Sequence, residues 1–245
     1  MITSSFFLLM PFLYGFDPIY LMITIGAMLV GFIVQSRLKS VLAANGQRPM
    51  PNGMSGKEVA EKMLRDNNIF DVAVVSVQGF LTDHYNPANK TVNLSAEVFE
   101  GRSITSASIA AHECGHAVQH AKSYAWLNLR STLVPVTQIA SNMTSFVIIA
   151  GLILTGMKWA MGPNIFLAGI ILFGVTTLFS IITLPVEFDA SRRALAWLND
   201  SNLLQGENHA RAVTGLKWAA MTYVVAALAS IAMLLYYIML FNRRD

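Results

Sequence analysis

Charged side chains are scarce in this 245-residue chain, and they are missing altogether from a few long stretches. Asp, Glu, Lys and Arg make up 13% of the residues, against roughly 25% in a typical soluble domain. Each uncharged run is about as long as the ~18–20 apolar residues that cross a bilayer as a helix, or longer. Four such runs in so short a chain disfavour an ordinary soluble core and predict four transmembrane helices. The runs are residues 18–35, 131–157, 159–186 and 218–242.

Cysteine is nearly absent, and so are the signs of a cleaved leader. Cys114 stands alone, which excludes an internal disulfide framework and fits a reducing compartment. Residues 1–16 are apolar but lack a basic n-region and a small-residue cleavage site. We therefore expect a retained segment at the membrane interface rather than a signal peptide. The net charge of +3 gives no case for a nucleic-acid partner.

Lys and Arg are few, and their distribution along the chain is uneven. Ten of the 17 fall in residues 37–130, and four more fall in residues 192–217. In membrane proteins the cytoplasmic loops carry the excess of these residues. We therefore expect a multi-pass protein of the cell membrane with both polar segments on the cytoplasmic side.

The most informative motif lies in the first polar segment. Residues 112–116 read HECGH and fit the pattern H-E-x-x-H. On a helix, residues i and i+4 share a face, so His112 and His116 can bind one metal ion. Glu113 would then lie beside the open position of the metal, where it can take a proton from bound water. The motif predicts a catalytic zinc site.

A catalytic zinc ion has three protein ligands and a water, so one ligand must come from elsewhere in the chain. Two predicted spans follow His116 and return the chain to the same side of the membrane. The first acids after them are Glu187 and Asp189, and carboxylates at a membrane edge are costly unless they are paired or bound to metal. We predict Glu187 as the third ligand. Asp189 points away from it on a helix, and two roles stay open: orienting a histidine as a hydrogen-bond acceptor, or pairing with Arg192 or Arg193.

The polar segment after the first span carries signals for local structure. Ser55 and Glu58 fit a capping box, which predicts a helix through Leu64. Valine-rich sequence and turn residues indicate the remaining elements. We expect strands at residues 71–78 and 91–94, a turn at 83–87, a helix from Ser103 or Thr105 to about Lys122, and an amphipathic helical segment at 185–217.

Two stretches of this chain resemble a known family. Residues 111–117 (AHECGHA) and 187–191 (EFDAS) look like the YugP-type membrane zinc metallopeptidases of the neutral zinc metallopeptidase family. The resemblance covers most of the chain, including residues 83–87 (DHYNP). The chain is also similar, more distantly, to membrane gluzincins of the heat-shock and prenyl-protein protease type. In those proteins H-E-x-x-H, a hairpin of spans and E-x-x-x-D follow one another.

The resemblance implies a cofactor and a site. The cofactor is Zn²⁺, the metal ligands are His112, His116 and Glu187, and Glu113 is the general base. No other cofactor site is implied. This chain departs from the E-x-x-x-D pattern because Ser191 stands at its last position.

These observations predict a mainly α membrane protein with four transmembrane helices. A small α+β, gluzincin-like catalytic domain is expected to be split around a transmembrane hairpin. The expected segments are 1–36 (N-terminal apolar segment and first transmembrane helix), 37–130 (first part of the catalytic domain), 131–185 (transmembrane hairpin), 186–217 (second part, with the third ligand) and 218–245 (fourth transmembrane helix and tail).

The predicted function is a membrane-anchored zinc metalloendopeptidase that acts on a peptide or membrane-protein substrate at the lipid bilayer. An extended peptide could pair with strand 91–94 by β-augmentation. A non-catalytic zinc-binding scaffold is one alternative, although structural zinc needs no base and prefers four protein ligands. A site-2-type intramembrane protease is another, although the H-E-x-x-H helix is polar and no L-D-G-like motif follows.

Other titratable residues have more ordinary interpretations. His120 continues the i+4 series one turn too far for the same tetrahedral site, so a supporting or surface role is favoured. His84 is expected as a turn residue, with oxyanion stabilisation as the alternative. Cys114 faces away from the metal and is expected to pack rather than act as a nucleophile. Glu207 and His209 are expected as solvated helix residues before the fourth span.

Overall fold

The computed structural model describes residues 17–79 and 81–243, and most of these residues are helical. The predicted interface segment 1–16 lies outside the described residues. The chain forms two compact units, each made of segments that are far apart in the sequence. The helical unit comprises the described residues up to Ile33, Leu129–Ile182 and those from Tyr223 onward. The mixed unit comprises Val34–Asn128 and Thr183–Thr222.

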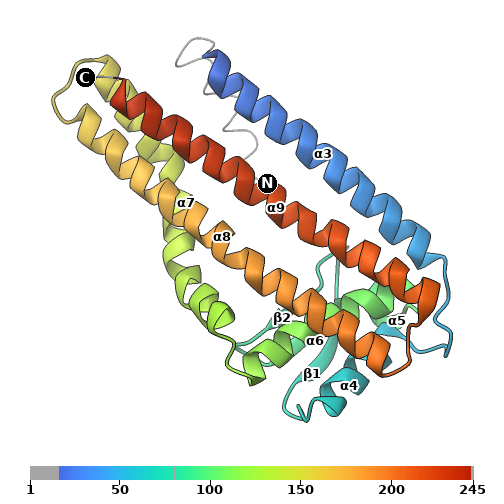
Figure 1. Ribbon diagram of the computed structural model, residues 1–245. Helices are drawn as coiled ribbons and strands as arrows, with labels where there is room; N and C mark the ends of the chain where they lie inside the picture. Colours follow the sequence, from blue (N-terminus) through green and yellow to red (C-terminus); the bar gives the residue numbers. More distant parts are fainter. Residues whose placement is uncertain (1–16, 80, 244–245) are drawn as a thin grey trace. The chain divides into compact units, whose positions relative to one another are not determined.

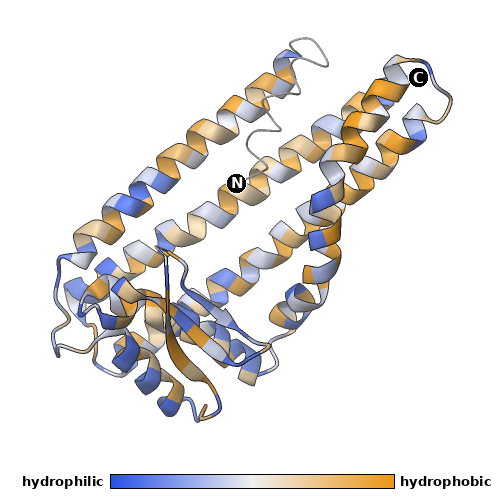
Figure 2. Cartoon of the chain, turned by 180° about the vertical axis from the view of Figure 1, so that it is seen from behind, coloured by the Kyte–Doolittle hydropathy of each residue, from blue (hydrophilic) through white to orange (hydrophobic). Residues whose placement is uncertain are grey.

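Four long helices contain the charge-free runs. Each is long and apolar enough to cross a membrane, with a mean hydropathy between 1.7 and 2.5 in its most apolar window. Hydrophobic residues predominate along these helices (Figure 2). The predicted four spanning helices are thereby confirmed in length and composition. They are α3 (Pro18–Gly46), α7 (Ala125–Gly156), α8 (Gly162–Asp200) and α9 (Gly206–Asn242) (Figure 1).

The long helices continue past the charge-free runs into polar sequence. Residues 185–217, predicted as one amphipathic segment, instead divide between α8 and α9, with a turn at residues 201–205. Pro185 lies inside α8. A proline removes one main-chain hydrogen bond, and long apolar helices tolerate this loss where other groups satisfy the freed carbonyl. The residues just after the third charge-free run are therefore held on a continuous helix.

The mixed unit adds three short helices, α4 (Gly56–Asp66), α5 (Ala96–Glu100) and α6 (Ile104–Ala121). The predicted capping box begins α4. Ser55 Oγ accepts a hydrogen bond from the Glu58 amide at 3.3 Å, and the Glu58 carboxylate accepts one from the Ser55 amide at 2.7 Å. One face of α4 buries Val59, Ala60 and Met63 in the core of the unit, to which α6 also contributes.

The sheet of the mixed unit has three strands in the order β1, β3, β2. β1 (Ala73–Val77) pairs in parallel with β3 (Thr91–Ser95), and β2 (His84–Asn86) pairs antiparallel with β3. The strands predicted at 71–78 and 91–94 are confirmed. The turn predicted at 83–87 is wrong, because residues 84–86 form β2 and the turn lies at 87–90.

β3 is the central strand of this sheet. Its residues Val92 and Leu94 are fully buried, as expected for a strand with neighbours on both sides. The expectation that β3 is an edge open to a peptide is therefore wrong, since both of its edges are paired. Among the described strands, the edges of the sheet are β1 and β2.

Candidate metal centre

The structure brings His112, His116 and Glu187 together in the mixed unit. Glu187 Oε2 lies 3.3 Å from His112 Nε2 and 3.7 Å from His116 Nε2. One ligand atom from each residue falls within 4.8 Å of the other two. Two ligand atoms bound to one zinc ion at ~2.0–2.1 Å in tetrahedral geometry lie about 3.4 Å apart. The three side chains therefore fit a zinc ion without rearrangement of the backbone.

Helix α6 supplies the two histidines. Ser103 caps its N-terminus, because Ser103 Oγ accepts a hydrogen bond from the Ser106 amide at 3.1 Å. This start, and the end at Ala121, match the helix predicted from the sequence. The imidazole rings of His112 and His116 stack edge to face, with centroids 4.9 Å apart. The i, i+4 spacing thus presents two ring nitrogens to one point.

Gly115 allows α6 to approach α8 closely. A Cβ atom at this position would lie 2.5 Å from the carbonyl oxygen of Ala190 and 3.1 Å from its Cα. The residues around the contact are also small, and Ala111, Ala190 and Ala194 are completely buried. Backbone therefore packs on backbone here, which places Glu187 of α8 beside the histidines of α6.

Each histidine has a second partner at its other ring nitrogen. Ser191 Oγ lies 3.1 Å from His112 Nδ1, and Gln119 Oε1 lies 3.0 Å from His116 Nδ1. When the oxygen accepts the Nδ1–H, the Nε2 lone pair is left free for a metal. Ser191 stands where the E-x-x-x-D pattern has aspartate, and it still contacts a histidine.

Asp189 does not touch either histidine directly. Its carboxylate accepts hydrogen bonds from Gln119 Nε2 at 2.9 Å and from Arg193 Nε at 2.5 Å, and it also pairs with Arg192. Because Gln119 in turn contacts His116, Asp189 acts on the histidine through one intervening side chain. Asp189 thus pairs with both arginines and is linked to His116 only through Gln119, and its role at the metal site stays a prediction.

Glu113 lies one residue from His112 on α6 and is 8% exposed. Among the described residues its carboxylate has no side-chain hydrogen bond. A buried carboxylate without a fixed partner is expensive unless a ligand or water satisfies it. Glu113 is therefore a buried carboxylate next to the metal cluster that no described side chain binds.

The ionisable groups of the site perturb one another. Burial disfavours the charged form of Glu187, but the adjacent His112 and His116 side chains favour it and hold the pKa of the carboxyl well below its usual range. Burial alone would lower the pKa of His116, whereas the Glu187 carboxylate beside it raises that pKa overall. The pocket thus favours positive charge next to Glu187, which a proton or a metal cation supplies.

The remaining candidates lie outside the metal cluster. His120 Nδ1 is 2.7 Å from the hydroxyl of Tyr85 on β2, in line with a supporting role. His84 is exposed, and its Nδ1 is 2.8 Å from the Thr82 carbonyl. Cys114 is completely buried, and burial together with the nearby Glu113 charge raises the pKa of its thiol well above the usual value. The expected packing role of Cys114 is confirmed.

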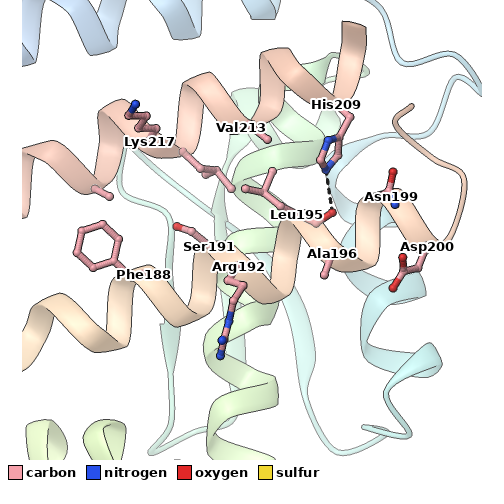
Figure 3. A pocket seen from close by; sticks show the side chains of 12 residues that line it. Phe188, Ser191, Arg192, Leu195, Ala196, Asn199, Asp200, His209, Val213 and Lys217 are labelled. Carbon is pink, nitrogen blue, oxygen red and sulfur yellow. Dashed lines mark hydrogen bonds between the residues drawn. The ribbon is translucent and has the colours of Figure 1, made fainter. Parts of the chain in front are cut away.

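A cavity of about 700 Å³ lies between α8 and α9 within the mixed unit (Figure 3). Ser191 and Leu195 line it from α8, and His209 and Val213 line it from α9. His209 is half-buried there, with Nε2 3.1 Å from the Leu195 carbonyl, so it links the two helices and is not merely a solvated residue (Figure 3). Glu207 is exposed, as expected, and it also pairs with Arg211. The serine that contacts His112 thus also faces this cavity.

From the sequence we did not predict the contact of Gln119 with His116 or the close helix packing at Gly115. A signal for Gln119 was present, because it lies at i+3 from His116 and i+7 from His112 on α6. No local signal could reveal that Gly115 meets Ala190, since the two residues are far apart in the chain. The distant packing partner decides the role of this glycine.

Comparisons with known proteins agree with the geometry. A family model described as "Putative neutral zinc metallopeptidase" matches residues 20–242. The chain is 38% identical over 228 residues to the "Putative membrane protease YugP" of Bacillus subtilis (strain 168), a match that covers 93% of this chain and 99% of that protein. No solved structure matches significantly. With a His-His-Glu cluster of zinc-like spacing and four helices apolar enough to cross a membrane, the chain belongs to the neutral zinc metallopeptidase family.

Proposed function

We propose that this protein is a membrane-anchored zinc metalloendopeptidase whose catalytic domain is the mixed unit. The observation that carries the proposal is the cluster of His112, His116 and Glu187 with Glu113 beside it, whose carboxylate no described side chain binds. Three ligands leave a fourth position open for water, which is the arrangement of catalytic rather than structural zinc. The family and the relative's name both support peptide hydrolysis.

In the proposed mechanism His112 and His116 would hold the metal through Nε2, and Glu187 would hold it through its carboxylate. When bound, zinc lowers the pKa of its bound water to about 7 and polarises the scissile carbonyl. Glu113 accepts the proton of the attacking water and later delivers it to the leaving amine. Ser191 and Gln119 keep the imidazoles in the orientation that this chemistry needs.

The substrate is proposed to lie along β2. This edge strand packs beside α6, because the Tyr85 hydroxyl on β2 contacts His120 one turn after His116. A cavity of about 560 Å³ continues along the same helix. Ile109, one turn before Glu113, lines it together with Asp83, which immediately precedes β2. An extended peptide paired to the free edge of β2 would pass Glu113 and reach this cavity.

We propose that the mixed unit is a gluzincin-like catalytic domain on the cytoplasmic side of the cell membrane. The catalytic domain is proposed to comprise residues 37–130 and 186–217, which nearly coincide with the two parts of the mixed unit, Val34–Asn128 and Thr183–Thr222. The hairpin 131–185 is proposed to anchor it. The excess of Lys and Arg in these two parts supports the orientation. The bilayer and a peptide or membrane-protein substrate are its proposed partners.

Two alternatives have less support. A zinc-binding scaffold does not require a buried carboxylate beside the metal cluster, and Glu113 has no side-chain hydrogen bond within the described part of the chain. A site-2-type intramembrane protease would carry H-E-x-x-H on a spanning helix, but α6 has 18 residues and is not among the helices apolar enough to span.

The test combines metal analysis with proteolysis of a peptide library by the full chain in detergent or nanodiscs. Wild type is expected to hold one zinc ion and to cleave peptides. Glu113→Gln is expected to keep the zinc and lose cleavage by about 10²-fold or more, because only the proton acceptor is removed. Zinc binding by wild type without any cleavage would favour the scaffold.

A further inference from the structure

Gln119 is a completely buried amide that has a partner for each of its polar atoms. Its Oε1 lies 3.0 Å from His116 Nδ1, and its Nε2 donates to the Val186 carbonyl at 2.8 Å and to Asp189 Oδ2 at 2.9 Å. Burying an amide without hydrogen bonds is costly, so this set of contacts fixes the side chain strongly. Two of its three partners lie on α8, although Gln119 itself belongs to α6.

These contacts settle which way the amide points. A carbonyl and a carboxylate oxygen can only accept, so the NH₂ group must face Val186 and Asp189. Oε1 then faces His116 and accepts its Nδ1–H. The imidazole is left with its lone pair on Nε2, the nitrogen 3.7 Å from Glu187 Oε2.

We propose that Gln119 is a positioning residue of the metal centre that acts on both His116 and Glu187. This inference rests on the proposed function. Gln119 holds His116 in the tautomer and ring orientation that bind zinc, and it ties α6 to the peptide carbonyl immediately before the ligand Glu187. One side chain thus sets both the chemistry of one ligand and its distance from another.

The Asp189 carboxylate that accepts a hydrogen bond from Gln119 is itself held in place by other residues. Arg193 Nε donates to the same Asp189 oxygen that accepts from Gln119 Nε2. The Arg193 guanidinium lies over the Tyr124 ring, 5.7 Å from its centroid, and the Tyr124 amide donates to the Gln119 main-chain carbonyl at 2.9 Å. A substitution that weakens the hydrogen bond between Asp189 and Gln119 should therefore loosen the orientation of His116, but less than replacing Gln119 itself.

The test is Gln119→Met, which keeps the volume and removes all three hydrogen bonds. Zinc affinity is measured by chelator competition on the purified full chain in detergent, and the visible spectrum of the cobalt-substituted protein reports on ligand geometry. Removing a hydrogen-bond partner of a ligating histidine typically weakens metal affinity about 10- to 100-fold. We expect a loss in that range and a changed cobalt spectrum. Val118→Ala is the control, because it empties space at the adjacent buried position of α6 and should leave the affinity of the folded protein unchanged.

Gln119→Glu separates positioning from packing. Glutamate keeps an acceptor for His116 Nδ1 but places a charge beside Asp189, so this variant should be less stable than Gln119→Met and yet bind zinc more tightly than it does. The opposite order of zinc affinities, or a wild-type affinity in Gln119→Met, would overturn the inference. If neither variant folds, Asp189→Asn decides, with a several-fold loss expected and no loss refuting it. Failure of wild type to bind zinc would instead refute the proposed function.

Discussion

Replacing Gly115 with alanine tests whether the close contact between α6 and α8 sets the geometry of the metal centre. The added Cβ would lie 2.5 Å from the Ala190 carbonyl oxygen, whereas carbon and oxygen in contact are normally about 3.3 Å apart or more. Because the obstacle is backbone rather than a flexible side chain, the helices must separate by about 0.8 Å to reach that contact distance. Zinc–ligand distances tolerate changes of only about 0.2 Å.

The consequences for stability and for binding differ in size. Overpacking of this kind costs about 1–3 kcal/mol, and the higher helix propensity of alanine offsets about 0.5–1 kcal/mol of it. The net loss of stability should therefore be modest. Displacing reacting groups by about 1 Å can lower the rate about 10²-fold. We expect Gly115→Ala to remain folded but to bind zinc at least tenfold more weakly and to lose most peptidase activity.

The assay compares thermal unfolding and zinc affinity in Gly115→Ala and in Gly174→Ala. Gly174 lies within α8, and a Cβ added there would meet no atom within 4 Å, so alanine should be neutral or slightly stabilising at that position. Wild-type zinc affinity in Gly115→Ala would refute the reasoning, since it would mean that α8 shifts without moving Glu187.

Three further outcomes follow from the site. Glu187→Gln should lose zinc in equilibrium dialysis, whereas Asp189→Asn should retain it at reduced affinity; the reverse would mean that the third ligand is misassigned. In the metal-free protein the pKa of His116 is raised. A proton therefore begins to compete with zinc for this side chain at a pH above the usual histidine pKa of about 6.5. Zinc affinity measured by titration calorimetry should therefore fall as the pH drops through that raised pKa and recover above it, and a flat profile between about pH 6 and 8 would contradict this. Cys114 should react with iodoacetamide only after unfolding, because its buried thiol stays protonated; rapid labelling of the native protein would show that the core around α6 opens.

The sequence predicts those parts of the structure that depend on short-range chemistry. Ser55 with Glu58 marks the start of α4, and Ser103 marks the start of α6, because a capping side chain bonds its own helix. Counting charge-free runs then locates Glu187, since an even number of crossings returns the chain to one side. That argument needs only helix length and hydropathy.

Other parts depend on contacts between distant segments, which no local pattern encodes. β2 is only three residues long and exists because β3 offers it a partner, so its sequence looks like a turn. The role of Asp189 required knowing that Gln119 lies between it and His116. In the sequence Ser191 is only a departure from the E-x-x-x-D pattern, whereas the structure shows that it contacts His112.

The division of the metal centre between α6 and α8 has a consequence for biosynthesis. Glu187 follows His116 by 187 − 116 = 71 residues, which a ribosome adds in about 4 to 14 s at ~5–20 residues per second. During that time the two histidines have neither their carboxylate partner nor Ser191, so a nascent chain cannot hold the ion as the finished protein would. We therefore predict that metal loading is a late event, which follows synthesis of the residues between His116 and Glu187. A chain that stalls before this point would lack one of the three proposed metal ligands.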